Sequence, residues 1–137
     1  MPSQEKFMVR QFYGIINSAS FDKLDAILSS KVVWHDPLLP GGEVRGIEAF
    51  KKVLAMFRSA FPDLHITVED QIQENDKVVT RFLITGTHSG ELMGIPPTGR
   101  RFSIGGISII RFEQLKATEE WIQEDGLGLM RQLGAVK

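Results

Sequence analysis

The segment Leu64–His88, "LHITVEDQIQENDKVVTRFLITGTH", changes the hydrophobic pattern of the chain from a helical spacing to an alternation. Its first part, "LHITVEDQIQ", begins with apolar and polar side chains in turn, the period of two that is typical of a strand with one buried face. "ENDK" supplies a turn, and "KVVTRFLITGTH" is rich in strand-forming residues. The segment therefore predicts two long antiparallel strands.

The chain before this segment is predicted to be largely helical. Apolar residues at helical spacing predict an amphipathic helix over residues 4–17, and Ser20 can cap a short second helix over residues 21–29. "KVVWHDP" is a short strand candidate that Pro37 ends. A third helix is expected from Ile47 until just before Pro62, since proline disfavours helical geometry in the residue before it.

The chain after this segment is predicted to add two more strands, "RFSIGGISIIRF" and "TEEWIQED", and one or two terminal helical turns over "GLGLMRQLG". Gly86, Gly105 and Gly106 lie inside predicted strands, where glycine commonly marks a bulge or a sharp bend. We predict an α+β fold for a single domain, residues 1–137. It consists of a curved antiparallel sheet forming a cone-shaped half-barrel, packed on N-terminal helices and enclosing a pocket.

Composition excludes several classes of function. The 137 residues include 16 Lys and Arg against 17 Asp and Glu, and no basic run is longer than Arg100-Arg101, so nucleic acid is not an expected partner. The absence of cysteine excludes disulfides, thiolate metal sites and a cysteine nucleophile. We find no apolar run typical of a signal peptide or a membrane span, and expect a soluble, cytoplasmic protein without a membrane partner.

Asp125 is the first candidate for chemistry, and two readings of it compete. Along the last predicted strand, alternation places Trp121 and Asp125 on one face and Glu120 and Glu124 on the other. If the first face is concave, Asp125 is a desolvated pocket carboxylate whose raised pKa suits proton abstraction. Asp125 also immediately precedes the terminal helix, and aspartate is a common N-cap. The local pattern alone favours the cap.

Two histidines are weaker candidates. His88 continues an apolar strand face into a glycine- and proline-rich loop, which fits either a hydrogen-bonded core residue or a pocket acid/base group. His35 and Asp36 are sequence neighbours that point to opposite faces of a strand, which makes them a poor metal pair. With no third ligand at a recognisable spacing, no metal site is predicted.

Arg81 and the two tryptophans are candidates for contacts with a ligand. Arg81 lies mid-strand, where it either pairs with a carboxylate such as Glu119 or holds an acidic substrate, and the ion pair is the commoner case. Trp34 and Trp121 fit either plain core packing or the wall of a flat apolar cavity.

Three motifs in order, "AFPDLHITVED", "GTHSGELMGIPPTGR" and "EEWIQEDGLGLMRQLG", give the chain a family resemblance. From about Trp34 to Gly134 it resembles the SnoaL-like polyketide cyclase family, within the cone-shaped superfamily that includes ketosteroid isomerase. The hairpin "RFEQLKATEEW" departs from the pattern, because it carries Leu115 and Ala117 where relatives usually have a Gly-Lys-Ile-type turn.

The resemblance implies a reaction and a set of site residues. Family cyclases close a ring by intramolecular aldol condensation without metal or organic cofactor, and dimers are common. Carried onto this sequence, Asp125 would remove a proton next to a carbonyl and His88 would be its hydrogen-bonding or relay partner. Trp34, His35, Arg81 and Trp121 would be pocket walls or substrate-orienting groups.

Reaction type and assembly stay open at this point. Isomerisation and dehydration use the same scaffold, and fold likeness does not determine the reaction. We expect a small hydrophobic ligand, no cofactor and a homodimer. The alternative is a non-catalytic module that binds a small molecule or dimerises, for which Ile107 and Ile109 on the second face of their strand could contact another subunit.

Overall fold

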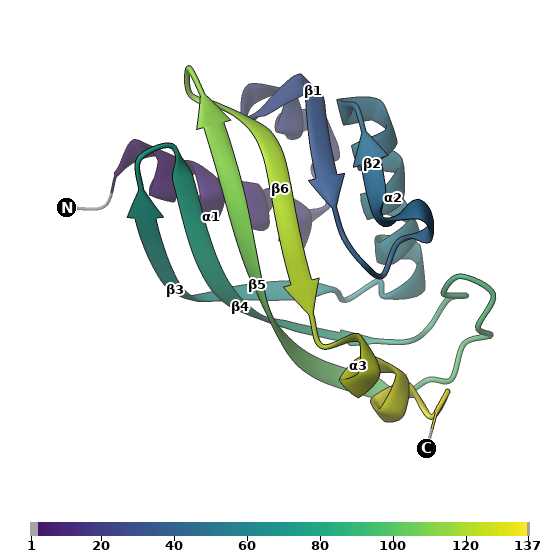
Figure 1. The fold of residues 1–137 in the computed structure, drawn as a ribbon. Coiled ribbons are helices and arrows are strands. Elements are labelled where there is room, and N and C mark those ends of the chain that lie inside the picture. The colour runs from purple at the N-terminus through teal and green to yellow at the C-terminus, as the bar shows by residue number, and fades with distance from the viewer. Residues whose placement is uncertain (1–2, 137) are drawn as a thin grey trace.

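The computed structural model describes residues 3–136 as a curved sheet with helices on one side (Figure 1). The elements in chain order are α1 (Gln4–Ser18), η1 (Phe21–Ala26), β1 (Leu28–His35), η2 (Pro40–Gly42), β2 (Glu43–Arg45), α2 (Ile47–Ala60), β3 (His65–Glu74), β4 (Lys77–Thr87), β5 (Arg101–Glu113), β6 (Lys116–Glu124) and α3 (Gly126–Leu133). Within residues 3–136, no helix combines the length and the apolar character that crossing a membrane requires.

The six strands form one sheet in the order β2-β1-β6-β5-β4-β3. Neighbouring strands are antiparallel except β1 and β6, which run parallel with Trp34 beside Glu120 and His35 beside Trp121. The predicted α+β fold with a mainly antiparallel sheet on N-terminal helices is confirmed. The parallel pair was not predicted, because it joins segments more than 80 residues apart and leaves no local pattern.

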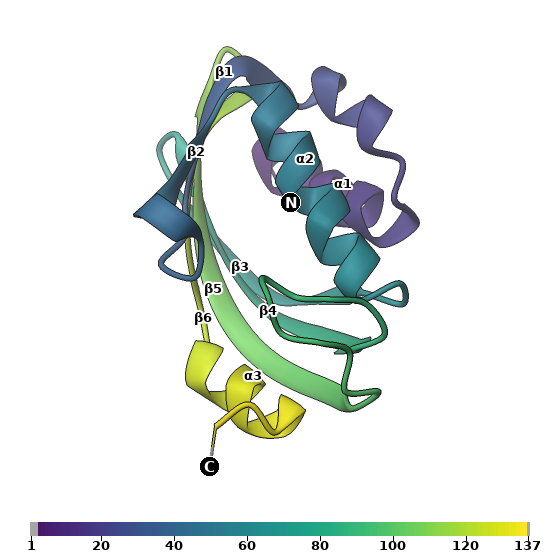
Figure 2. The ribbon, with the colours of Figure 1, turned by 90° about the vertical axis from the view of Figure 1, so that its right-hand side faces the viewer.

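The helices α1 and α2 cover the concave side of the sheet, and β4 and β5 bend around them (Figure 2). Each helix turns one apolar stripe inward, as the spacing predicted, with Phe12 and Ile16 buried on α1 and Phe50 and Leu54 on α2. The short helix α3 lies at the far end of the sheet, where it packs against β5. The concave face and the two long helices therefore enclose the core.

Two local predictions differ from the structure. The second helix is a 3-10 helix that ends at Ala26, Ser20 makes no side-chain capping bond, and β1 already begins at Leu28. The segment after β1 was expected to be a loop throughout, but it contains η2 and the three-residue edge strand β2. Pairing with β1, at positions such as Val44 beside Trp34, holds this glycine-rich segment extended.

Candidate functional site

A pocket of about 90 Å³ lies between the concave face of the sheet and the helices. The lining residues are Phe12, Tyr13, Ile16, Trp34, Leu38, Phe50, Leu54, Phe57, Phe61, Leu64, Ile66, Ile84, Phe102, Ile104, Glu120, Ile122, Glu124 and Leu129. Most are apolar or aromatic, so the pocket suits a small hydrophobic molecule. Two ionisable carboxyl groups, those of Glu120 and Glu124, are set into this apolar wall.

Glu120 faces the pocket because alternate residues of β6 point to the concave side, and Ile122 lies two positions further on the same face. Its side chain is buried, with 4% of the residue exposed, and its Oε2 has no hydrogen-bond partner in the part of the chain that the structure describes. Burial, followed by the nearby negative charge of Asp36, raises the pKa of Glu120 to about 8. At neutral pH this carboxyl group is mainly protonated.

Glu124 ends β6 on the same face, and its pKa is raised to about 9. Burial is the largest cause, and the charges of Asp36 and Glu120 add to it. Asp36 follows β1, where its Oδ1 accepts a hydrogen bond from the Leu38 amide at 2.9 Å, and it is 1% exposed. Within residues 3–136, its Oδ2 and the Glu124 Oε2 have no hydrogen-bond donor, and a side-chain hydrogen bond between the two carboxyl groups is a further cause of the raised pKa of Glu124. Asp36 is not among the residues that line the pocket, but it influences both glutamates.

Two further polar side chains line the pocket. Trp34 is 4% exposed, and its Nε1 has no hydrogen-bond partner among residues 3–136. The Tyr13 hydroxyl lies 2.7 Å from Ser108 Oγ, and burial, with the charge of Glu120 second, raises the pKa of Tyr13 well above its ordinary value. Tyr13 is therefore a neutral hydroxyl group at physiological pH, able to donate or accept a hydrogen bond.

His88 is fully buried where β4 ends, as the apolar strand face predicted, but it is not among the residues that line the pocket. The Thr98 amide donates a hydrogen bond to His88 Nδ1 at 3.3 Å, and Thr98 Oγ1 lies 3.0 Å from the same nitrogen. Because an amide can only donate, the neutral ring carries its proton on Nε2, for which the described residues offer no partner. His88 thus connects the loop before Arg100 to β4.

Asp125 and Trp121 lie outside the pocket, contrary to the expected orientation of their face. Asp125 is exposed and caps α3, its Oδ1 accepting a hydrogen bond from the Gly128 amide at 2.8 Å. Trp121 stacks on His35, with ring centroids 5.4 Å apart, on the convex side of the sheet. The face that contains Trp121 is convex because Glu120 and Ile122 take the concave side beneath α1 and α2.

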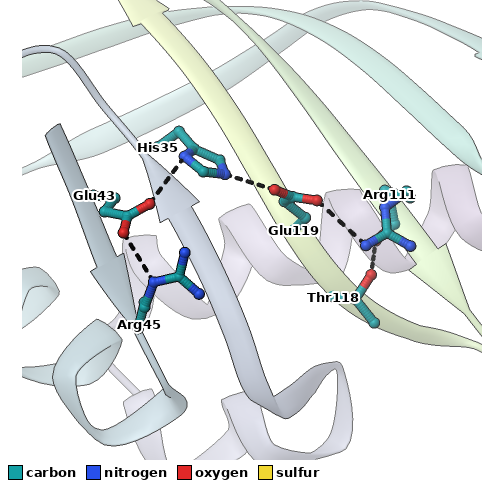
Figure 3. Close-up of polar contacts among 6 residues, drawn as sticks. All are labelled: His35, Glu43, Arg45, Arg111, Thr118 and Glu119. Atoms are coloured by element: carbon teal, nitrogen blue, oxygen red, sulfur yellow. Dashed lines mark hydrogen bonds and ion pairs between the residues drawn. The ribbon is translucent and has the colours of Figure 1, made fainter.

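His35 and Arg81 also lie away from the pocket. His35 Nε2 is 2.6 Å from Glu119, which Arg111 contacts at 3.3 Å, in a network on the side of the sheet turned away from the helices (Figure 3). The hydrogen bond from His35, and then that from Arg111, lower the pKa of Glu119. Arg81 makes an ion pair as expected, but at 2.9 Å from Glu69 on β3 rather than with Glu119.

Among the expected ligand-contacting residues, Trp34 alone lines the pocket. The sequence reasoning missed Asp36, Glu120 and Glu124. The sequence does contain a signal for the two glutamates, because Glu120 and Glu124 flank the apolar Ile122 on one strand face. Carboxylates are rarely buried on an apolar face unless they are paired or have a function.

The fold and the site together define an α+β protein in which a curved sheet and two helices enclose an apolar pocket with ionisable groups in its wall. The chain belongs to the SnoaL-like polyketide cyclase family, whose model matches residues 6–133.

Comparison with individual proteins agrees with this membership. The chain is 32% identical to the aklanonic acid methyl ester cyclase DauD of Streptomyces sp. (strain C5), over 93% of this chain and 80% of the relative. It is 31% identical to the aklanonic acid methyl ester cyclase DnrD of Streptomyces peucetius, over 93% of this chain and 88% of that protein. The solved structure of TsrD from Streptomyces laurentii superimposes with a TM-score of 0.87 at 32% identity, covering 99% of each chain.

Proposed function

We propose that this protein is a cofactor-independent enzyme that performs acid/base chemistry on a small hydrophobic carbonyl compound. Aldol cyclisation is the leading reaction, and isomerisation or dehydration would use the same groups. The observation that carries the proposal is the pair of glutamates, Glu120, which is buried, and Glu124, which is half-buried, with pKa values of about 8 and about 9, in an otherwise apolar pocket. Such values lie close to the pH at which an enzyme works, which favours proton transfer.

The pair can take both roles that the reaction needs. A protonated carboxyl group in an apolar site donates a hydrogen bond to a carbonyl oxygen and stabilises the enolate that forms there. An ionised partner accepts the proton from the neighbouring carbon. Because the charge of Glu120 contributes to the raised pKa of Glu124, the two titrations are linked. One carboxyl group of the pair is then the base and the other the acid.

The substrate proposal also draws on the relatives. DauD and DnrD are named for aklanonic acid methyl ester, a polyketide-derived ester. Aromatic side chains such as Phe12, Phe50 and Phe57 line the pocket here, and they suit a flat, apolar ring system. We therefore propose a neutral polyketide-type ester or ketone as the substrate.

The test is turnover of aklanonic acid methyl ester by the wild type and by Glu120→Gln and Glu124→Gln. Each variant keeps the side-chain shape and removes the titratable proton. We expect kcat to fall by about 10²–10⁴-fold, with a smaller change in KM. Glu119→Gln is the matched control, since Glu119 is adjacent in β6 but belongs to the convex network. A wild-type rate retained by both pocket variants would exclude the glutamates as the acid and base.

Asp125 and His88 stay predictions as catalytic groups, and the same assay tests them. Asp125→Asn preserves a capping side chain and removes the carboxylate. If this variant alone loses turnover, Asp125 is the base and must leave its cap during the reaction. For His88→Asn, a loss of kcat while the loop around Thr98 stays ordered would support a direct role of His88 in catalysis. If kcat falls and the loop also loses its order, the role of His88 is to position the loop.

A second candidate is a non-catalytic module that binds a small molecule or dimerises. The observation that favours it is the use of Asp125 as a cap, together with the exposure of Ile107, 49%, on the convex face. Saturable binding of aklanonic acid methyl ester without any turnover, unchanged in Glu120→Gln and Glu124→Gln, would support this candidate over the enzyme.

A further inference from the structure

Trp34 presents a buried hydrogen-bond donor without an acceptor. The indole ring packs against Phe50, with ring centroids 4.7 Å apart, and 4% of the residue is exposed. An indole nitrogen can only donate, and Trp34 Nε1 has no partner in the part of the chain that the structure describes. Buried donors are almost always satisfied, so this N–H calls for an acceptor that the chain itself does not supply.

One of the two sheet neighbours of Trp34 also has a buried polar atom without a hydrogen-bond partner in the described part of the chain. Trp34 on β1 lies directly beside Glu120 on β6 in the parallel ladder, so their backbones are about 4.8 Å apart. Both side chains point to the concave face and line the pocket. Glu120 Oε2 is also buried without a partner. Two unsatisfied polar groups from neighbouring strands thus meet at one wall of an apolar cavity.

We propose that Trp34 Nε1–H and the protonated Glu120 carboxyl group together bind one oxygen atom of the ligand. A carbonyl oxygen has two lone pairs and can accept from both donors, whereas the surrounding wall offers it mainly aromatic and aliphatic groups. The ligand is then a flat apolar compound with a carbonyl oxygen at the edge that reaches β1 and β6. One part of this inference rests on the proposed function, namely that the bound oxygen is the carbonyl oxygen of the group that becomes the enolate.

This arrangement also gives Trp34 a chemical role beyond a pocket wall. A fixed N–H that points at the position of a developing oxyanion stabilises the transition state more than the ground state. Glu120 cannot donate to that oxygen and remove a proton at the same moment. Glu124 supplies the second carboxyl group of the pair and is then the base, while Glu120 shares the oxygen with Trp34.

The test is binding of two ligands that differ in one oxygen, 1-tetralone and tetralin, measured by calorimetry without any turnover. Trp34 is replaced by β-(3-benzothienyl)alanine, which keeps the shape of the ring system and has sulfur in place of the N–H. We expect the preference for 1-tetralone over tetralin to fall by about five- to tenfold relative to wild type. The carbonyl stretch of bound 1-tetralone should shift to higher frequency in the variant.

Controls separate this effect from packing. Phe57→Leu alters an apolar lining residue, so it should weaken both ligands and leave their ratio unchanged. A ratio within twofold of wild type in the isosteric Trp34 variant would overturn the proposal. It would also be overturned by a crystal structure of the 1-tetralone complex in which Trp34 Nε1 binds only an ordered water. Because no turnover is measured, failure here leaves the roles of the glutamates in catalysis to their own assay.

Discussion

Gly106 of β5 lies opposite Phe82 of β4, and the Phe82 ring occupies the space that a side chain at Gly106 would need. A Cβ atom at Gly106 would come within 2.7 Å of two Phe82 ring atoms and 2.9 Å of the Gln123 carbonyl oxygen. Phe82 is fully buried, and Glu124 lies beside Gly106 on β6. The missing side chain therefore allows the ring to pack over the bent strand next to the acidic end of the pocket.

Gly106→Ala should consequently destabilise the fold. The methyl group must displace a buried ring and meets a backbone oxygen that cannot move freely, so we expect a loss of about 1–3 kcal/mol in the free energy of unfolding. Gly105→Ala is the matched control, because its Cβ would have no neighbour closer than 3.8 Å, the Phe82 carbonyl oxygen. Urea denaturation of both variants measures the difference, and equal midpoints would contradict this explanation of Gly106.

Glu120→Gln should stabilise the protein, and the gain should depend on pH. The pKa of Glu120 rises from 4.5 to about 8 on folding, so the folded state keeps a proton that the unfolded state loses between these values. Stability from this group is fully present below pH 4.5 and is lost as the pH rises toward 8, at up to about 1.4 kcal/mol per pH unit. Glutamine cannot ionise and does not incur this loss.

The measurement is thermal or urea unfolding of wild type and Glu120→Gln at pH 5 and pH 8. The free energy of unfolding of the variant should match that of wild type near pH 5 and exceed it by about 2–4 kcal/mol at pH 8. The gain is smaller than the full pKa shift would give, because water that enters the pocket solvates part of the charge. Glu119→Gln provides a control of opposite sign, because the pKa of Glu119 is lowered by His35 and Arg111. Parallel stability curves for wild type and Glu120→Gln across this range would refute a protonated Glu120.

Leu115→Gly should stabilise the β5–β6 hairpin. Its two turn residues, Gln114 and Leu115, both have positive φ angles, 49° and 62°, which non-glycine side chains disfavour. The two-residue loop requires this geometry, and glycine adopts it without strain. We expect a gain of about 0.5–1 kcal/mol, measured by urea denaturation. Leu115→Ala removes the same exposed side chain but keeps the strain, so an equal gain from alanine would contradict the argument.

The sequence predicted which side chains of β6 share a face, but it did not predict which of the two faces lines the pocket. Alternation along β6 correctly separates Trp121 from Glu120, because side-chain direction in a strand depends only on its own period. Which of these faces is concave depends on α1 and α2 and on the parallel pairing of β1 with β6. These contacts join residues far apart in sequence, so no local pattern determines whether Glu120 or Trp121 faces the pocket.

The same limit explains the treatment of Asp125 and Asp36. For Asp125, the local capping preference correctly predicted its hydrogen bond to Gly128, and the face shared with Trp121, together with the resemblance to a cyclase family, favoured a pocket position. The sequence pattern of Asp36 indicates only a poor metal pair with its neighbour His35. Its influence on Glu120 and Glu124 requires the approach of β1 to β6, which appears only in the folded chain.

The convex face should mediate a homodimer, as the family resemblance implied. Ile107 is 49% exposed there, and Ile109 lies beside Trp121 in the ladder of β5 and β6, so apolar side chains cluster next to the network of His35 and Glu119. Exposed apolar groups of this kind are commonly covered by a partner.

We expect sedimentation to report a dimer for the wild type and a monomer for Ile107→Glu, because dimerisation would bury the new charge. Ile72→Glu is the control, since Ile72 is more exposed, at 62%, but lies on the edge strand β3. A monomeric wild type at tens of micromolar, or dissociation caused equally by both substitutions, would show that this face is not the interface.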